Sequence, residues 1–211
     1  MMAFYRRWIL ACTAGELVGI GVATGAALAI NSWIGEPRSV GARLSTLGVF
    51  AAVGALEGGA LAGFQWSVLR ARLPRLRARE WVGVTVALAV AGWLIGMTPS
   101  LFLYNDAPPQ AEPGLDVILS AAAIAGAVAG LCFGLVQWMV LRRYAKHASR
   151  WIWIHMPAWA LALSAIFLGA SVPDAGSPAW FIAVAGVAGG LLGGVLLGAV
   201  TGLVARELQP V

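Results

Sequence analysis

The chain has 211 residues, of which 60% are hydrophobic and only 11% are charged. Soluble domains carry roughly a quarter charged residues, so this composition excludes the soluble globular class. The formal net charge of +5 needs no nucleic acid to explain it, because arginines at a membrane surface orient helices and contact anionic lipid headgroups. We therefore predict an integral membrane protein that contacts the lipid bilayer and has no nucleic-acid partner.

Six apolar stretches are each long enough to cross a bilayer as a helix, which takes about 20 residues. In chain order they are residues 8–31, 44–70, 81–104, 116–142, 151–171 and 180–205. None of them shows the alternation of polar and apolar residues that a transmembrane β-barrel needs. The predicted fold class is all-α: one polytopic transmembrane domain of six helices over residues 1–211.

Basic residues gather on one side of this six-span arrangement and acidic residues on the other. The basic side holds twelve of the fourteen Lys and Arg residues: Arg6, Arg7, Arg70, Arg72, Arg75, Arg77, Arg79, Arg142, Arg143, Lys146, Arg150 and Arg206. The other side holds Arg38, Arg43, Glu36, Asp106, Glu112, Asp116 and Asp174. The positive-inside rule then predicts that both termini are cytoplasmic, with loops near 71–80 and 143–150 inside and loops near 32–43, 105–115 and 172–179 outside.

A glycine-rich run that ends in Gln-Trp-x-x-Leu-Arg occurs twice, and a weaker form of it occurs a third time. The two full copies lie 72 residues apart and end at Arg70 and Arg142. In the third copy, 64 residues further on, Thr201 stands where the other copies have glutamine, and the final arginine is retained as Arg206. Repetition on this scale indicates copies of one structural unit. We predict three helical hairpins, about 1–75, 76–147 and 148–211, as parallel repeats about an axis along the membrane normal.

The second helix of each predicted hairpin is rich in glycine at four-residue spacing. The glycines concerned are Gly54, Gly58, Gly126, Gly130, Gly190 and Gly194. Small residues at this spacing let helix backbones approach closely in lipid, where no hydrophobic force drives helices together. We predict that these three helices form an inner layer and touch one another through their glycines. A substrate path along the smooth backbone is the alternative.

Tryptophans accompany the basic residues at the predicted membrane boundary. Trp8, Trp81 and Trp151 begin the three hairpins. An indole ring favours the headgroup region, where its N–H reaches water. We predict that the tryptophans are chiefly interfacial anchors and that the repeated motif is interfacial as well. The motif residues are Gln65, Trp66, Arg70, Gln137, Trp138 and Arg142.

The glycine runs, the Gln-Trp-x-x-Leu-Arg endings and the basic loop before the next tryptophan-led span resemble a widespread group of bacterial small multi-pass membrane proteins. The resemblance covers the whole chain and is specific at Gln65-Trp66 with Leu69-Arg70 and at Gln137-Trp138 with Leu141-Arg142, but weakens at Thr201-Gly202. That group has no established activity. The resemblance supports the topology above in a bacterial inner membrane and carries over no catalytic residue.

Two acidic residues lie deep inside predicted spans. Glu16 is eight residues beyond Trp8, and Glu57 is thirteen residues before Arg70, so at a rise of about 1.5 Å per residue both lie within the hydrocarbon. An intramembrane acid is usually protonated, paired or in contact with water, and it is a candidate functional residue. We predict that both acids face the protein on adjacent antiparallel helices, within reach directly or through water. A protonated carboxyl bonded to backbone, a proton or cation pathway and a ligand contact all remain open.

His155 is the only histidine within a predicted span. An imidazole can ligate haem iron or the magnesium of a chlorophyll-type pigment, and the neighbouring indoles would suit a flat ring. No second axial ligand accompanies it, so the competing interpretation is an interfacial histidine bonded to backbone or to a headgroup. No other cofactor and no metal site is predicted.

Enzyme signatures such as Gly-x-Ser-x-Gly, His-Glu-x-x-His, Cys-x-x-Cys and the P-loop are absent from the sequence. We therefore predict a protein that is not an enzyme. The first candidate function is a non-catalytic membrane subunit or scaffold that packs against partner helices, lipids or pigments, in a larger complex or a homo-oligomer. The alternative is a small proton- or cation-coupled carrier or channel that uses Glu16 and Glu57. Matching helix interruptions in the repeats would point to a transport site, and none is visible.

Overall fold

The computed structural model of the protein describes residues 2–103, 113–174 and 176–211. Six helices in it are long and apolar enough to cross a membrane, which confirms the all-α polytopic fold. They are α1 (Met2–Ala29), α2 (Val40–Leu69), α3 (Ala78–Phe102), α4 (Leu115–Leu141), α5 (Arg150–Ser171) and α6 (Ala179–Ala205). Only α1 begins well before its expected span, since the helix continues outward through the two arginines that precede Trp8.

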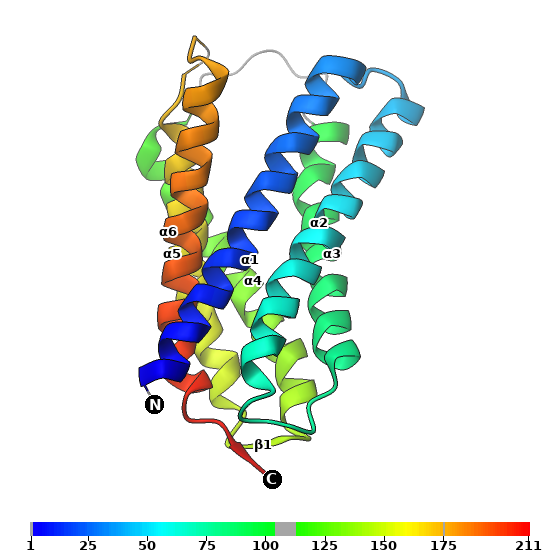
Figure 1. The fold of residues 1–211 in the computed structure, drawn as a ribbon. Helices are drawn as coiled ribbons and strands as arrows, with labels where there is room; N and C mark the ends of the chain where they lie inside the picture. Colours follow the sequence, from blue (N-terminus) through cyan, green and yellow to red (C-terminus); the bar gives the residue numbers. More distant parts are fainter. Residues whose placement is uncertain (1, 104–112, 175) are drawn as a thin grey trace.

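Both chain ends lie at the same end of the bundle, which we call the terminal end (Figure 1). Two short strands, β1 (Ala145–Lys146) and β2 (Gln209–Pro210), pair antiparallel there and tie the C-terminal tail to the α4–α5 turn. At the opposite end a π-helical turn, η1 (Ile30–Ile34), continues α1. It stops at Gly35, whose φ of 65° suits a residue without a Cβ. Most of the predicted loop 105–115, with Asp106 and Glu112, lies outside the described residues.

Helices that follow one another in the chain pack together, and α6 closes on α1. The contact between α3 and α4 is much sparser than the others. Within the described residues, α2, α4 and α6 make no extensive contact with one another. The predicted inner layer of three glycine-rich helices is therefore wrong.

The glycines of these three helices contact the first helix of a neighbouring hairpin instead. The predicted glycines of α2 meet α3, those of α4 meet α5, and those of α6 meet α1, whereas Gly189 and Gly193 of α6 meet α5 of their own hairpin. The pairs are Gly54 with Ala89 and Trp93, Gly58 with Ala89, Gly126 with Trp159, Gly130 with His155, Gly190 with Ile20, and Gly194 with Thr13. Because a first helix takes up each of these close contacts, the three glycine faces cannot also reach one another.

Candidate functional site

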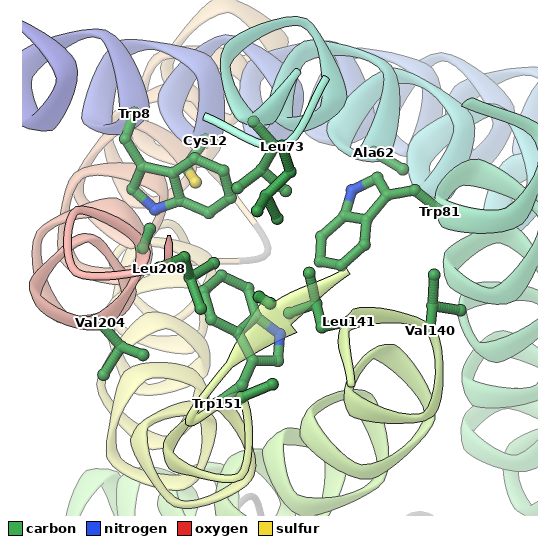
Figure 2. Close-up of a cluster of buried hydrophobic side chains, with 14 of the residues drawn as sticks. Trp8, Cys12, Ala62, Leu73, Trp81, Val140, Leu141, Trp151, Val204 and Leu208 are labelled. Atoms are coloured by element: carbon green, nitrogen blue, oxygen red, sulfur yellow. The ribbon is translucent and has the colours of Figure 1, made fainter. Parts of the chain in front are cut away.

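Three tryptophans from three different helices meet in the core of the terminal end (Figure 2). Trp8, Trp81 and Trp151 have no exposed surface. The ring of Trp151 lies edge-to-face with the other two, at centroid distances of 5.7 Å to Trp8 and 5.9 Å to Trp81, a geometry that the charge distribution of aromatic rings favours. The prediction that these three residues anchor the membrane surface is wrong, since none of them reaches it.

Buried hydrogen bonds explain why two of these indoles can lie in the core of the bundle and not at the membrane–water interface. Trp151 Nε1 donates to Gln137 Oε1 at 2.9 Å, and Trp8 Nε1 donates to Thr201 Oγ1 at 2.9 Å. Each N–H has exchanged water for a protein acceptor, so burying the ring leaves no unpaired donor. Thr201, which looked like a weakened copy of the motif, therefore acts as the acceptor that Gln137 is for Trp151.

The corresponding bond between Gln65 and Trp81 is not made. Trp81 Nε1 and Gln65 Oε1 are both buried and have no hydrogen-bond partner among the described residues. Gln65 donates instead from Nε2 to Cys12 Sγ at 3.5 Å. A buried polar group without a partner costs about 1–3 kcal/mol. This part of the core thus has unused hydrogen-bonding capacity that the other two parts lack.

The repeated motif divides between the core and the surface. Gln65 and Gln137 point into the core, where both are buried, and not toward headgroups. Trp66 and Trp138 are half-buried at the outside of the bundle. The arginine of each motif lies over the ring of its tryptophan. The Arg70 and Arg142 guanidinium groups lie 5.1 Å from the ring centroids of Trp66 and Trp138, respectively. These are cation–π distances, so each motif ends in a stacked tryptophan–arginine pair.

Glu16 lies inside the bundle. Its side chain is buried, and neither carboxyl oxygen has a hydrogen-bond partner among the described residues. The Cβ of Glu16 is 3.1 Å from the position that a Cβ on Gly194 would take, so the Glu16 side chain packs directly against the backbone of α6. Cys12 and Trp8 precede Glu16 by one and two turns on the same face of α1. Glu16 therefore lies beyond the tryptophan cluster, toward the middle of the bundle.

Glu57 is half-buried on α2 and has one clear partner. Trp93 Nε1 donates to its Oε2 at 2.6 Å. A Cβ on Gly19 would lie 2.6 Å from Glu57 Cγ, so the side chain of Glu57 lies over the α1 backbone about one turn from Glu16. No hydrogen bond joins the two carboxyl groups, since neither oxygen of Glu16 has a partner among the described residues.

Sequence reasoning missed Trp93 as the partner of Glu57. A signal was present, because Trp93 lies in the middle of the predicted span 81–104, far from either headgroup region. An indole at that depth needs a buried acceptor for its N–H. Among the described residues no three His, Cys, Asp or Glu side chains gather to hold a metal ion. A carboxyl group buried in the apolar core can take up and release a proton, and this is the chemistry that the two acids offer.

His155 is a buried core residue and does not lie at the membrane surface. Its Nδ1 is 2.8 Å from the carbonyl oxygen of Trp151, and its ring packs on that of Trp151 at a centroid distance of 4.6 Å. Because a carbonyl only accepts, Nδ1 must carry a proton and donate it to this oxygen. Gly130 of α4 lies directly against the His155 backbone. The imidazole is thus enclosed by protein and shows no open face to a haem or pigment ring.

The fold and these residues define a polytopic α-helical membrane protein with an aromatic core at one end and two acids near its middle. Comparison of the chain with protein-family models, with curated proteins and with solved structures found no match. Its function must therefore be inferred from the residues themselves.

Proposed function

We propose that the protein is a non-catalytic integral membrane subunit that contacts lipid over most of its surface and a partner helix at α3. The observation that carries the proposal is a pair of glycines, Gly92 and Gly96, one turn apart on α3. A Cβ at either position would meet no atom within 4 Å. α3 also buries the smallest share of its apolar window, 11% against 22–39% for the other helices.

Small residues one turn apart are the feature that lets two helices approach closely in lipid. In α2, α4 and α6 the glycines at this spacing contact a neighbouring helix of the same chain. Within the part of the chain that the structure describes, the pair on α3 has no such neighbour, and the large apolar side chain of Ile95 beside it is 74% exposed. A helix of another subunit, or of a second copy of this chain, fits this face.

Purification of the protein in native lipid particles tests the proposal. The wild type should be isolated in a complex larger than one chain. Gly92→Leu together with Gly96→Leu should release the partner without lowering the Tm of the isolated chain, because a Cβ at either position meets no described atom within 4 Å. Gly83→Leu, also on α3 and also open, is the matched control. A single chain under all conditions would overturn the proposal.

We infer that the terminal end faces the cytoplasm and that the bundle lies in a bacterial inner membrane. Twelve of the fourteen basic residues at that end support this orientation. In a Cys132→Ser background, which removes the exposed native thiol, a membrane-impermeant thiol reagent added to whole cells should label Glu36→Cys but not Arg75→Cys. Both positions are exposed in the structure. Labelling of position 75 alone would reverse the orientation.

We further infer that the three hairpins are copies of one unit, as in the bacterial group that the sequence resembles. Two features support this. Each glycine face of a second helix meets the first helix of a neighbouring hairpin, and the two buried indole bonds join corresponding motif positions, Trp151 to Gln137 and Trp8 to Thr201. An experimental structure in which the hairpins fail to superpose by rotation about one axis would contradict the inference.

A second candidate function is a small proton- or cation-coupled carrier or channel, and Glu16 is the residue that favours it. A buried carboxyl group that has no hydrogen-bond partner among the described residues, with a second acid packed about one helical turn away, is unusual in a purely structural core. In liposomes, Glu16→Gln and Glu57→Gln should each abolish proton or cation flux, whereas Glu80→Gln outside the apolar core should retain it. Absence of any flux with the wild type would exclude this candidate and leave the subunit.

A further inference from the structure

A groove of about 450 Å³ lies on the outside of the first hairpin, between α1 and α2 near the terminal end. Arg7 and Arg70 line it at the ends of the two helices, and Leu10, Ala14 and Phe64 line it further in. Leu10 and Phe64 are exposed, so this wall faces lipid in a membrane. Between Arg7 and Ala14 the groove follows α1 for about 10 Å, at the helical rise of 1.5 Å per residue.

The two arginines of this groove have no acidic partner among the residues that the structure describes. No ion pair among the described residues includes Arg7 or Arg70. Arg70 stacks on the ring of Trp66, which holds its guanidinium group at the mouth of the groove while its N–H groups remain able to bond an anion. The groove thus combines two positive charges at the membrane boundary with an apolar wall that extends into the hydrocarbon.

The corresponding positions of the other hairpins do not offer this combination. In the second hairpin the residue before the leading tryptophan is Glu80, which is paired with Arg143 at 3.1 Å. In the third it is Arg150, which is paired with Glu207. Among the described residues, the first hairpin thus has an arginine at the corresponding position of each of its helices, Arg7 and Arg70, and neither is in an ion pair. The feature is therefore specific to α1 and α2 and is not a general property of basic residues at this end.

We propose that this groove binds one anionic phospholipid, with its phosphate between Arg7 and Arg70 and an acyl chain along Leu10, Ala14 and Phe64. Guanidinium groups match phosphate oxygens in a fork geometry that an ammonium group does not provide. The apolar wall commits the site to a lipid, because a free phosphate ion would leave that wall uncovered. The inference goes beyond the proposed subunit role, since it assigns a ligand to a surface other than the partner face of α3.

Native mass spectrometry of the full-length protein tests the site, with phosphatidylglycerol and phosphatidylcholine of the same acyl chains as probes. Phosphatidylglycerol should bind more tightly. Arg7→Ala and Arg70→Ala should each weaken its binding about fivefold, the effect of one basic residue at an anionic membrane surface. Arg142→Ala is the matched control, because Arg142 stacks on Trp138 in the same way but lies in the hairpin that carries Glu80. It should leave the binding unchanged.

A second variant tests the apolar wall with both arginines intact. Ala14→Leu should fill part of the groove and weaken phosphatidylglycerol binding, and inorganic phosphate should not displace the lipid. Equal affinity for the two lipids, an effect of Arg142→Ala as large as that of Arg7→Ala, or displacement by inorganic phosphate would each overturn the proposal. Arg7 and Arg70 are exposed, so an unchanged Tm separates a loss of binding from a loss of fold.

Discussion

Gly58→Ala tests the close contact between α2 and α3. The new Cβ would lie 2.7 Å from Ala89 Cβ and 3.1 Å from Val86 Cα. Neither atom is at the end of a flexible side chain, so the two helices must separate until the shortest distance approaches 3.4 Å, where ordinary contact begins. Overpacking of this kind costs about 1–3 kcal/mol. The higher helix propensity of alanine offsets up to about 1 kcal/mol of that cost.

Gly63→Ala on the same helix is the matched control, because a Cβ there meets no atom within 4 Å. It receives the same gain in helix propensity, so the difference between the two variants isolates the contact. For a chain of this length each kcal/mol shifts Tm by about 2–4 °C. Thermal unfolding in one detergent should therefore place Gly58→Ala below Gly63→Ala by about 2–12 °C. Equal Tm values would refute the close contact between these helices.

Two further predictions concern hydrogen bonds. Trp151→Phe leaves Gln137 Oε1 buried without its donor, whereas Trp81→Phe removes an N–H that has no partner among the described residues. Trp151→Phe should therefore cost about 1–3 kcal/mol more than Trp81→Phe. Equal losses in thermal unfolding would contradict this. The Tyr144 hydroxyl donates to Glu80 at 2.8 Å, and this bond raises the pKa of Tyr144 above its ordinary value of 10. Its stabilisation should persist up to about pH 10 and be lost as the pH rises through the raised pKa. Tm measured against pH should show that alkaline loss in the wild type and not in Tyr144→Phe.

The six helices could be predicted because their apolar stretches are long and the charges between them mark their ends. The faces through which these helices pack against one another could not be predicted from the sequence. In water, burial separates polar from apolar faces, but in a membrane both the protein interior and the lipid are apolar. Gly58 and Gly92 are both glycines in the middle of apolar spans, yet a Cβ on Gly58 would meet α3 and a Cβ on Gly92 would meet no described atom within 4 Å. Only the position of the neighbouring helix distinguishes the two.

The tryptophans show the same limit for single residues. An indole suits the headgroup region and a core equally well, provided that its N–H has an acceptor. For Trp8 that acceptor is Thr201, 193 residues away in the chain, and no local pattern reveals such a contact. The motif register did place Thr201 opposite Gln65 and Gln137. Combined with the repeat, it could have shown that these three positions face the leading tryptophans.

Although the packing recurs around the bundle, the unpaired polar groups do not. Within the described residues, the buried side-chain atoms without a hydrogen-bond partner belong to Glu16, Thr46, Gln65 and Trp81, all on α1, α2 or α3. The groove with two unpaired arginines lies on α1 and α2 as well, and the exposed glycine pair lies on α3. By contrast, Gln137 of α4 accepts a hydrogen bond from Trp151 of α5 and donates one to Thr85 of α3. A core that only stabilises the fold would satisfy its polar groups equally in every hairpin. The first three helices are therefore where binding of a ligand, a lipid or a partner helix has the most to contribute.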